Sequence, residues 1–215
     1  SAEHRPGGDL ALPAFDPAGG DGVLRGLDGE HDRKLQARWT RGGLSLSAIT
    51  SEREKTVPTA PYGLVFGERS VWTDRMTLLG ATWQRLGADG AGWSVQTGLG
   101  FYDYHDVGRY EPDRLLTTYR NQGRWWQGEL RRTWRLGEGH LLLVGADLQR
   151  NFRQTWRQTV DEPGGPPEAT IATDSTRYGL FVTDEITLAP TLKLGLGARL
   201  DHGGDGRSDL TPRGA

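Results

Sequence analysis

The residues of this chain best suited to chemistry lie in one short run, Tyr102-Asp103-Tyr104-His105-Asp106. A histidine flanked by carboxylates has the side chains of a general base and of the acid that orients it. Successive side chains of a strand point to opposite faces, so Asp103 and His105 share one face and Tyr104 takes the other. A general base also requires a substrate pocket, which this run does not supply. We therefore predict that it anchors the end of a strand, and we predict no catalytic residue and no enzyme activity.

Ligand contact is the second interpretation of this region. Tyr104, His105, Arg109 and Tyr110 combine aromatic rings with a guanidinium on one loop. Such groups suit bulky, oxygen-rich or anionic ligands such as metal chelates, because they stack and donate hydrogen bonds. These four residues are the predicted ligand-binding positions.

Other candidate metal ligands lack the spacing that a metal site needs. His31-Asp32 and Asp201-His202 are isolated pairs, and the loop 203–209 lacks the acidic spacing and the terminal glutamate of a calcium loop. The chain contains no cysteine, which excludes a disulfide scaffold and a thiolate-ligated zinc or iron–sulfur site. A formal net charge of −2 gives no basic footprint for nucleic acid. We predict no metal, no cofactor and no nucleic-acid partner.

The composition of the elements that hold these residues is polar and rich in glycine. The chain has 215 residues, of which 32 are glycine, 35 % are hydrophobic and eight are tryptophan. Its mean hydropathy is −0.61. No run approaches the ~18 apolar residues of a spanning helix, and the aromatic content is too high for a disordered chain. At face value, these numbers describe a soluble β protein.

Short glycine- or proline-containing turns recur along the chain at 41–43, 87–92, 137–139 and 189–191. Each is flanked by alternating apolar and polar residues, the pattern of a strand with one apolar face. After the second turn, for example, Trp93, Val95 and Leu99 alternate with Ser94 and Gln96. The pattern predicts a loop over 1–31 and four hairpins over 32–54, 73–105, 121–152 and 175–202.

These strands are longer than those of ordinary globular sheets, which run ~5–6 residues. Transmembrane barrel strands need ~9–11 residues, and they join short turns on one side of the membrane and long loops on the other. Aromatic residues are then expected at both interfaces, Trp83, Trp93 and Trp134 at the short turns and Tyr102, Tyr104, Trp125 and Phe152 at the long loops. We therefore predict an all-β, transmembrane, antiparallel up-and-down β-barrel with about eight strands in this chain.

Four charged residues test that assignment of faces. Arg132 and Asp184 fall on the lipid face, but near short turns, where a charge costs roughly 0–1 kcal/mol against ~2–4 for a basic residue at the midplane. Glu185 and Lys193 face the lumen on paired strands, and we expect an ion pair there. A propeller is disfavoured because each blade needs four short strands. A complete eight-stranded barrel fits the count, but a further strand begins near Leu210.

Three stretches resemble one known family. Residues 178–188 (YGLFVTDEITL), 192–202 (LKLGLGARLDH) and 210–213 (LTPR) follow the series Y-x-x-F-x-x-D-E-x-x-L, L-x-x-G-x-R-x-D and P-R. That series resembles the barrel strands of TonB-dependent outer-membrane receptors. Two earlier parts are similar to a bacterial branch of the family, namely GLDGE at 26–30 with KTVPTAPYG at 55–63, and WWQGEL at 125–130 with NFRQ at 151–154.

The resemblance implies a piece of a plugged barrel of about 22 strands in the outer membrane of a Gram-negative bacterium. It implies outer-membrane lipid, a plug domain and the TonB complex as partners, and transport of a scarce ligand, an iron–siderophore complex first and cobalamin or other nutrients second. Plug contacts would come from the lumen-facing Glu185, Lys193 and Arg199. The alternatives are a small non-transporting outer-membrane barrel (adhesin or envelope anchor) and a soluble carbohydrate-binding β domain.

Overall fold

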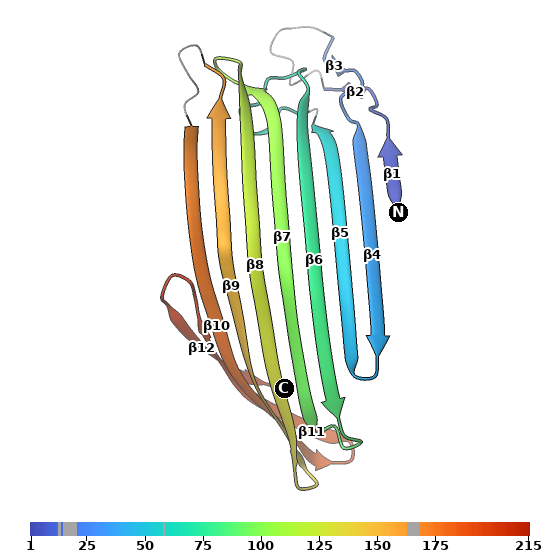
Figure 1. Cartoon of the computed structure of the whole chain (residues 1–215), viewed down its shortest axis with the longest axis vertical. Helices are drawn as coiled ribbons and strands as arrows, with labels where there is room; N and C mark the ends of the chain where they lie inside the picture. Colours follow the sequence, from blue (N-terminus) through green and yellow to red (C-terminus); the bar gives the residue numbers. More distant parts are fainter. Residues whose placement is uncertain (13, 15–20, 58, 163–167) are drawn as a thin grey trace.

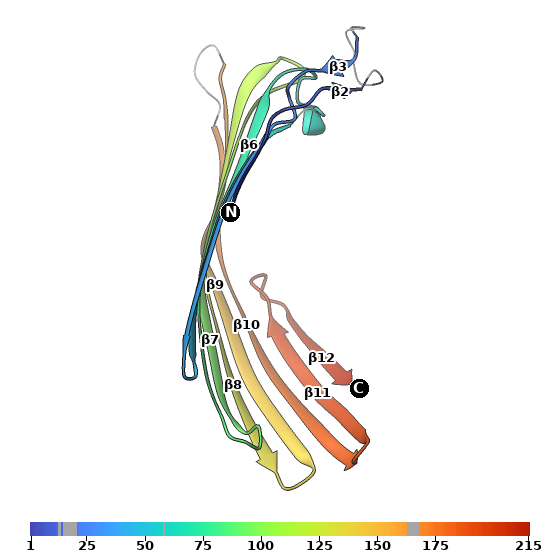
Figure 2. The same cartoon turned by 90° about the vertical axis from the view of Figure 1, so that its right-hand side faces the viewer.

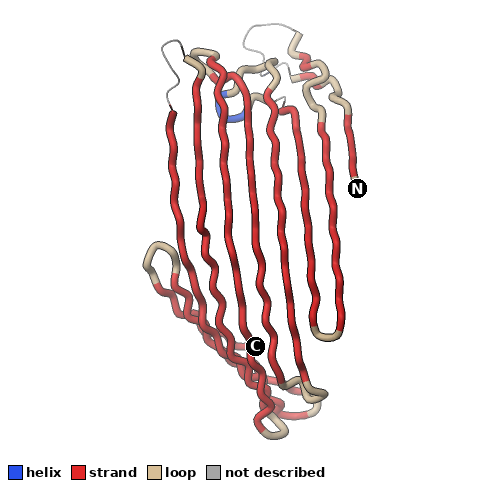
Figure 3. The backbone as a smooth tube through the Cα atoms, in the orientation of Figure 1, coloured by secondary structure: helices blue, strands red, loops and turns tan. Residues whose placement is uncertain are grey.

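The chain is built almost entirely of long β-strands (Figures 1 and 3). The computed structural model describes residues 1–12, 14, 21–57, 59–162 and 168–215; the remaining positions fall within predicted loops and lie outside the described residues. The strands are β1 (Ala2–Arg5), β2 (Leu10–Ala11), β3 (Val23–Leu24), β4 (Glu30–Arg41), β5 (Leu44–Val57), β6 (Ser70–Leu86), β7 (Gly92–Tyr110), β8 (Leu115–Leu136), β9 (His140–Val160), β10 (Glu168–Ala189), β11 (Leu192–His202) and β12 (Ser208–Gly214). A short 3₁₀ turn, η2 (Pro61–Gly63), lies between β5 and β6. None of the helices in the described parts of the chain is long and apolar enough to cross a bilayer.

Within the described residues, ten strands form one antiparallel sheet in the order β1-β4-β5-β6-β7-β8-β9-β10-β11-β12. From β4 onward each strand pairs with the next along the chain, which is the predicted up-and-down topology. The strand expected near Leu210 is present, because β12 pairs with β11 through Leu200 and Leu210. The sheet is open, with β1 and β12 at its two edges.

The described part of the segment 1–31 contains three short strands, where the sequence pattern predicts a loop. Its residues Ala2–Arg5 add strand β1 to the edge of the sheet by pairing with β4, His4 opposite His31. This pairing uses backbone hydrogen bonds at polar, exposed positions, so no apolar alternation marks it in the sequence. A second hairpin, β2–β3, stands apart from the sheet.

The long strands also continue well beyond the predicted hairpins. β7 and β8 pair as far as Tyr110 and Leu115, through most of the segment that the sequence pattern assigns to a loop. The apolar alternation ends near residue 101, but the hydrogen-bond ladder does not depend on it. These upper extensions of the strands, beyond the predicted hairpins, carry the residues of the candidate site at the upper end of the sheet.

The short turns of the sheet lie at one end, and the opposite ends of the same strands lie at the other. The turns β4–β5, β6–β7, β8–β9 and β10–β11 lie at the lower end in Figure 1, and the opposite ends of β5 to β10 lie at the upper end. Figure 2 shows the sheet curving so that β10–β12 lie toward the same side as η2 and β2–β3. Bulges near Arg124 and Trp125 and between Thr173 and Ser175 break the register where the strands bend. The side of η2 is called the concave face below, and the opposite side the convex face.

In the lower half, the convex face is a continuous apolar band that no other element of the described chain covers. Leu79 lies opposite Leu99, and Leu130 opposite both Val95 and Ala146. Leu130 remains 45 % exposed, and buried large hydrophobic side chains in the described chain are limited to Leu24, Leu64 and Val65. An uncovered apolar band of this size is unfavourable in water and is the surface that lipid solvates.

The two charges expected on the lipid face are each partnered near the lower end. The Arg132 guanidinium lies 4.9 Å from the Trp93 ring centroid and 5.4 Å from that of Trp134. Asp184 Oδ2 lies 2.7 Å from His140 Nδ1. Both sites are at the short-turn ends of their strands, as predicted.

One part of the predicted aromatic girdle is wrong. Tyr102, Tyr104 and Trp125 belong to the concave face, so they do not contribute to the lipid-facing interface. The Trp125 ring lies directly over Gly100, where an added Cβ would come within 2.0 Å of it. The strand period of two explains the correction, because Tyr102 and Tyr104 share the parity of Gln96 and Gly100 rather than that of Leu99.

Candidate functional site

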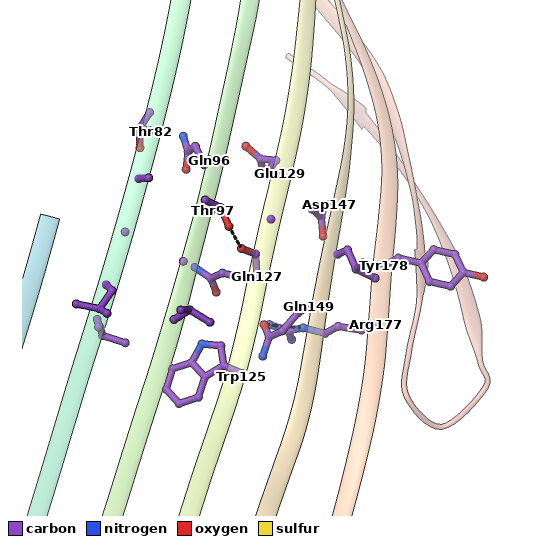
Figure 4. A pocket seen from close by; sticks show the side chains of 18 of the residues that line it. Thr82, Gln96, Thr97, Trp125, Gln127, Glu129, Asp147, Gln149, Arg177 and Tyr178 are labelled. Atoms are coloured by element: carbon purple, nitrogen blue, oxygen red, sulfur yellow. Dashed lines mark hydrogen bonds between the residues drawn. The ribbon is translucent and has the colours of Figure 1, made fainter. Parts of the chain in front are cut away.

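The concave face of the lower half holds a half-open cavity of about 830 Å³, lined by both polar and apolar groups (Figure 4). Amide and charged side chains line it, among them Gln96, Gln127, Glu129, Asp147 and Gln149. These residues alternate along their strands with the apolar band, which therefore faces the other way. The cavity is a segment of a wet lumen rather than a packed interior.

A guanidinium network crosses this lumen wall between β9 and β11. Arg199 forms ion pairs with Asp147 at 2.8 Å and Asp201 at 2.7 Å, and it lies 5.4 Å from the Phe181 ring centroid. Gly179 makes room for it, since a Cβ there would lie 2.2 Å from Arg199 Nη2. Arg199 thus lies on the concave face, paired with carboxylates of β9 and β11.

The lower rim of the lumen carries the predicted ion pair. Lys193 Nζ lies 2.5 Å from Glu185 Oε1, on paired strands next to the β10–β11 turn. Both side chains are exposed, so the pair is also available to another protein surface. Contact with a plug stays a prediction for Glu185, Lys193 and Arg199.

At the upper end, the concave face holds a buried acid. Asp106 is 3 % exposed and accepts hydrogen bonds from Tyr110 Oη at 2.7 Å and Ser70 Oγ at 3.3 Å. Ser70 in turn accepts a bond from Trp72 Nε1 at 3.0 Å. The chain of donors ends on the carboxylate, so one acid orients side chains from β6 and β7.

Burial raises the pKa of Asp106, and the bonds from Tyr110 and Ser70 oppose that shift only in part. Burial and the bond to Asp106 raise the pKa of Tyr110 as well, so its hydroxyl stays protonated as a donor. An acid in this setting holds a proton at a higher pH than an exposed aspartate does. The site can therefore present a neutral or a charged oxygen according to pH.

Aromatic rings line the concave face on both sides of Asp106. Tyr62 of η2 stacks on Trp72 at 6.3 Å between centroids, and Trp72 meets the edge of Tyr104 at 6.3 Å. On the other side, the rings of Tyr110, Tyr119 and Trp156 follow one another at 5.5 and 5.9 Å. We call these six rings the mouth cluster: Tyr62, Trp72, Tyr104, Tyr110, Tyr119 and Trp156.

The segment around η2 is held against the sheet by its own small apolar contact. Leu64 and Val65 are each 5 % exposed, and Val65 N donates to Arg109 O at 2.9 Å. Gly108 permits the approach, because a Cβ there would lie 2.5 Å from Leu64 Cδ2. Tyr62 has φ of 57°, an uncommon conformation for a tyrosine, and is 88 % exposed. The backbone is thus bent to present this ring to solvent above Trp72, the kind of strain that accumulates at binding sites.

The structure divides the four predicted ligand-binding residues between two faces. Tyr104 and Tyr110 join the mouth cluster, whereas His105 and Arg109 have the opposite parity on β7 and lie on the convex face. Arg109 bonds Arg114 O at 3.0 Å and pairs with Glu68 at 3.4 Å. The cluster's other members, Tyr62, Trp72, Tyr119 and Trp156, come from η2, β6, β8 and β9, so no local sequence pattern marks them.

In the described parts of the chain, no group of three or more histidine, cysteine, aspartate or glutamate side chains is arranged to hold a metal ion. The cluster has the features of a surface that stacks flat rings and donates hydrogen bonds. In comparison with known proteins, a family model described as TonB dependent receptor-like, beta-barrel, matches residues 13–215. No curated protein and no solved structure matches the chain.

Proposed function

The chain belongs to the TonB-dependent receptor-like β-barrel family, and from that premise we propose that it takes up a ferric siderophore through the mouth cluster. The family consists of receptors and transporters of the Gram-negative outer membrane rather than of enzymes. In this proposal the open sheet is part of a larger barrel, and a plug domain occupies the lumen beside Glu185, Lys193 and Arg199. The TonB complex pulls on the plug to release the bound ligand.

The observation that carries the proposal is the mouth cluster itself. Six aromatic rings lie at the upper end of the concave face, above a half-open cavity of about 830 Å³, which is within the ~300–1,000 Å³ of small-molecule sites. Ferric siderophores are bulky, rich in oxygen and commonly aromatic. Stacking on Tyr62 and Trp72 with hydrogen bonds from tyrosine hydroxyls would match that chemistry.

The test is ligand titration of the intact receptor in detergent, followed by quenching of tryptophan fluorescence. The probes are a ferric catecholate, a ferric hydroxamate and cobalamin. For the preferred probe we expect Tyr62→Ala and Trp72→Ala each to weaken binding about tenfold, the equivalent of roughly 1.4 kcal/mol for one lost stacking partner.

Trp83→Ala is the matched control, because Trp83 lies on the convex face beside the β6–β7 turn, opposite Val95. Its affinity should equal that of the unsubstituted receptor. Binding of cobalamin alone would contradict the siderophore assignment and keep the receptor assignment. Equal losses in Trp83→Ala and Trp72→Ala would contradict the assignment of the ligand site to the mouth cluster.

A further inference from the structure

Positive charge is confined to one face of the upper parts of β7 to β10. Above the level of Trp125, each arginine of these strands occupies a convex position: Arg109, Arg120, Arg124, Arg153 and Arg157. The same strands contain no lysine. Among the predicted ligand-binding residues, the two basic ones, His105 and Arg109, therefore lie on the side away from the mouth cluster.

At concave positions of the upper half, basic residues lie on β1, β4 and β5, and each is paired with a carboxylate. The pairs are Arg53 with Glu30 (2.7 Å), Lys34 with Asp32 (3.8 Å), Arg5 with Glu3 (2.7 Å) and Lys55 with Asp28. In the loops, Arg114 pairs with Glu68, and Arg69 lines a separate cleft with His31 and Glu54 of the convex face. Within the described residues, the mouth cluster therefore faces no unpaired lysine or arginine.

Two concave carboxylates beside the rings remain without a cation. Asp74 accepts a hydrogen bond from Tyr102 Oη at 2.6 Å, and Asp106 is held by Tyr110 and Ser70. Arg53 lies opposite Asp74 on the neighbouring strand, but its guanidinium pairs with Glu30. In the part of the chain that the structure describes, neither Asp74 nor Asp106 forms an ion pair, so the wall that carries the rings is acidic.

Two adjacent residues of β7 record the opposite signs of the two faces. On the concave face, burial and then the charges of Asp106 and Asp74 raise the pKa of Tyr104. On the convex face, burial and then the charge of Arg120 lower the pKa of His105. The potential thus changes from negative to positive across the thickness of one sheet, with the mouth cluster on the negative side.

We propose that the mouth cluster accepts a ferric chelate that is uncharged or positively charged, and that it excludes a chelate with a net negative charge. The inference rests on the proposed function, because it names the charge of the ligand for the same site. Faces of aromatic rings attract cations, and Asp74 and Asp106 add to that attraction. A trianionic ferric tris-catecholate has the same sign of charge as the wall and finds no unpaired guanidinium there. An uncharged ferric trihydroxamate, or one with a free ammonium group, meets no such repulsion.

The experiment varies the charge of the ligand on one scaffold. The intact receptor in detergent is titrated with a ferric trihydroxamate that has a terminal amine, with its acetylated form and with its succinylated form, which are a monocation, a neutral complex and a monoanion. We expect the succinylated form to bind about tenfold more weakly than the amine form, measured by tryptophan fluorescence. Added salt should reduce this ratio, because it screens the charges. Asp74→Asn should reduce it as well, since it removes one unpaired carboxylate and keeps the acceptor for Tyr102.

A lysine added to the concave wall should reverse the preference. Asn121 lies on β8 opposite Tyr104 and Trp156, so Asn121→Lys places an ammonium group among the rings. This variant should bind the succinylated chelate more tightly than the amine form. Gln122→Lys is the matched control, because it adds the same charge one residue farther along β8, on the convex face, and should leave the ratio unchanged.

The outcomes separate this inference from the proposed function. Failure of all three chelates to bind the unsubstituted receptor would contradict both. Equal affinities for the amine and succinylated forms, or the same change of their ratio in Gln122→Lys as in Asn121→Lys, would overturn the charge preference and leave the receptor assignment in place. Heat-modifiable gel migration shows whether each variant is folded, and the salt dependence in the unsubstituted receptor tests the charge preference without any variant.

Discussion

The lower and upper halves of the same strands have opposite polarity across the sheet. On β7, the lower convex positions are Trp93, Val95 and Leu99, and the concave positions between them are polar. Farther up the same strand, the convex face carries His105 and the concave face carries Tyr104 and Tyr110, which belong to the mouth cluster. The pairing of β7 with β8 has no register shift along this strand, so the strand does not switch faces. The inversion therefore reflects a change in what surrounds the two faces. Lipid outside the lower half and water around the upper half account for the inversion.

The largest effect should come from placing a charge in the band. Leu130→Arg puts a guanidinium midway between Trp134 and Trp126, and we expect it to reduce the free energy of unfolding in lipid vesicles by about 2–4 kcal/mol. Thr118→Arg, on the same face and strand but in the upper half, should change it by less than about 0.5 kcal/mol. Equal losses in a urea titration would show that the two halves share one environment.

A smaller loss of unfolding free energy is expected from a substitution in the lumen wall of the lower half. A Cβ on Gly145 would lie 2.2 Å from the Phe181 ring. Gly145→Ala should force that ring off Arg131 and Arg199 and cost about 1–3 kcal/mol of unfolding free energy, as overpacking does. Adding Phe181→Leu should recover part of the loss. An unchanged unfolding free energy in Gly145→Ala would show that Gly145 is not needed to make room for the Phe181 ring.

The upper half should respond to pH through Asp106. Its pKa lies above that of an unfolded carboxyl because of burial, so the folded state binds the proton more tightly. The stabilisation is complete below the unfolded pKa of ~3.9 and is lost as pH rises through the folded pKa. Hydrogen exchange of β6 and β7 near Ser70 and Tyr110 should therefore quicken with pH beyond its intrinsic rate. Asp106→Asn should abolish this additional pH dependence of exchange. If the additional pH dependence persists in Asp106→Asn, another titrating group causes it.

The smallest effect concerns the exposed pair at the lower rim. Lys193→Gln should lower the unfolding free energy by only about 0.2–1 kcal/mol, since exposed ion pairs are screened. Double-mutant cycles with Glu185→Gln measure the coupling directly. A coupling well above 1 kcal/mol would show that the pair is shielded from water when the barrel is complete.

The lower half was predictable because one face must meet lipid, and a period of two in the sequence records that constraint. The pairing partners of β5 to β11, the outward Arg132 and the Glu185–Lys193 pair all follow from it. In the upper half the constraint is gone, and the sequence pattern misplaces strand ends and the aromatic rings of Tyr102 and Tyr104.

Two features of the upper half could not be read from local sequence. The contact of Tyr62 with Trp72 depends on a loop with positive φ, and β1 depends on edge hydrogen bonds between exposed polar residues. The facing of Arg153 and Arg124 depends on the bulge at Arg124 and Trp125, which shifts the parity of β9. One extra residue at a β-bulge decides which face the following side chains take. The alternation of apolar and polar residues in the sequence does not show where that extra residue lies.

The most direct test of the inverted polarity uses the absence of cysteine from the chain. Single cysteines at Leu130 and Thr118, on one face of β8, can carry spin labels in the intact receptor in bilayers. We predict that the label at 130 is relaxed by oxygen and shielded from a water-soluble nickel chelate, and that the label at 118 behaves in the opposite way. Equal exposure of both labels to the nickel chelate would contradict the account.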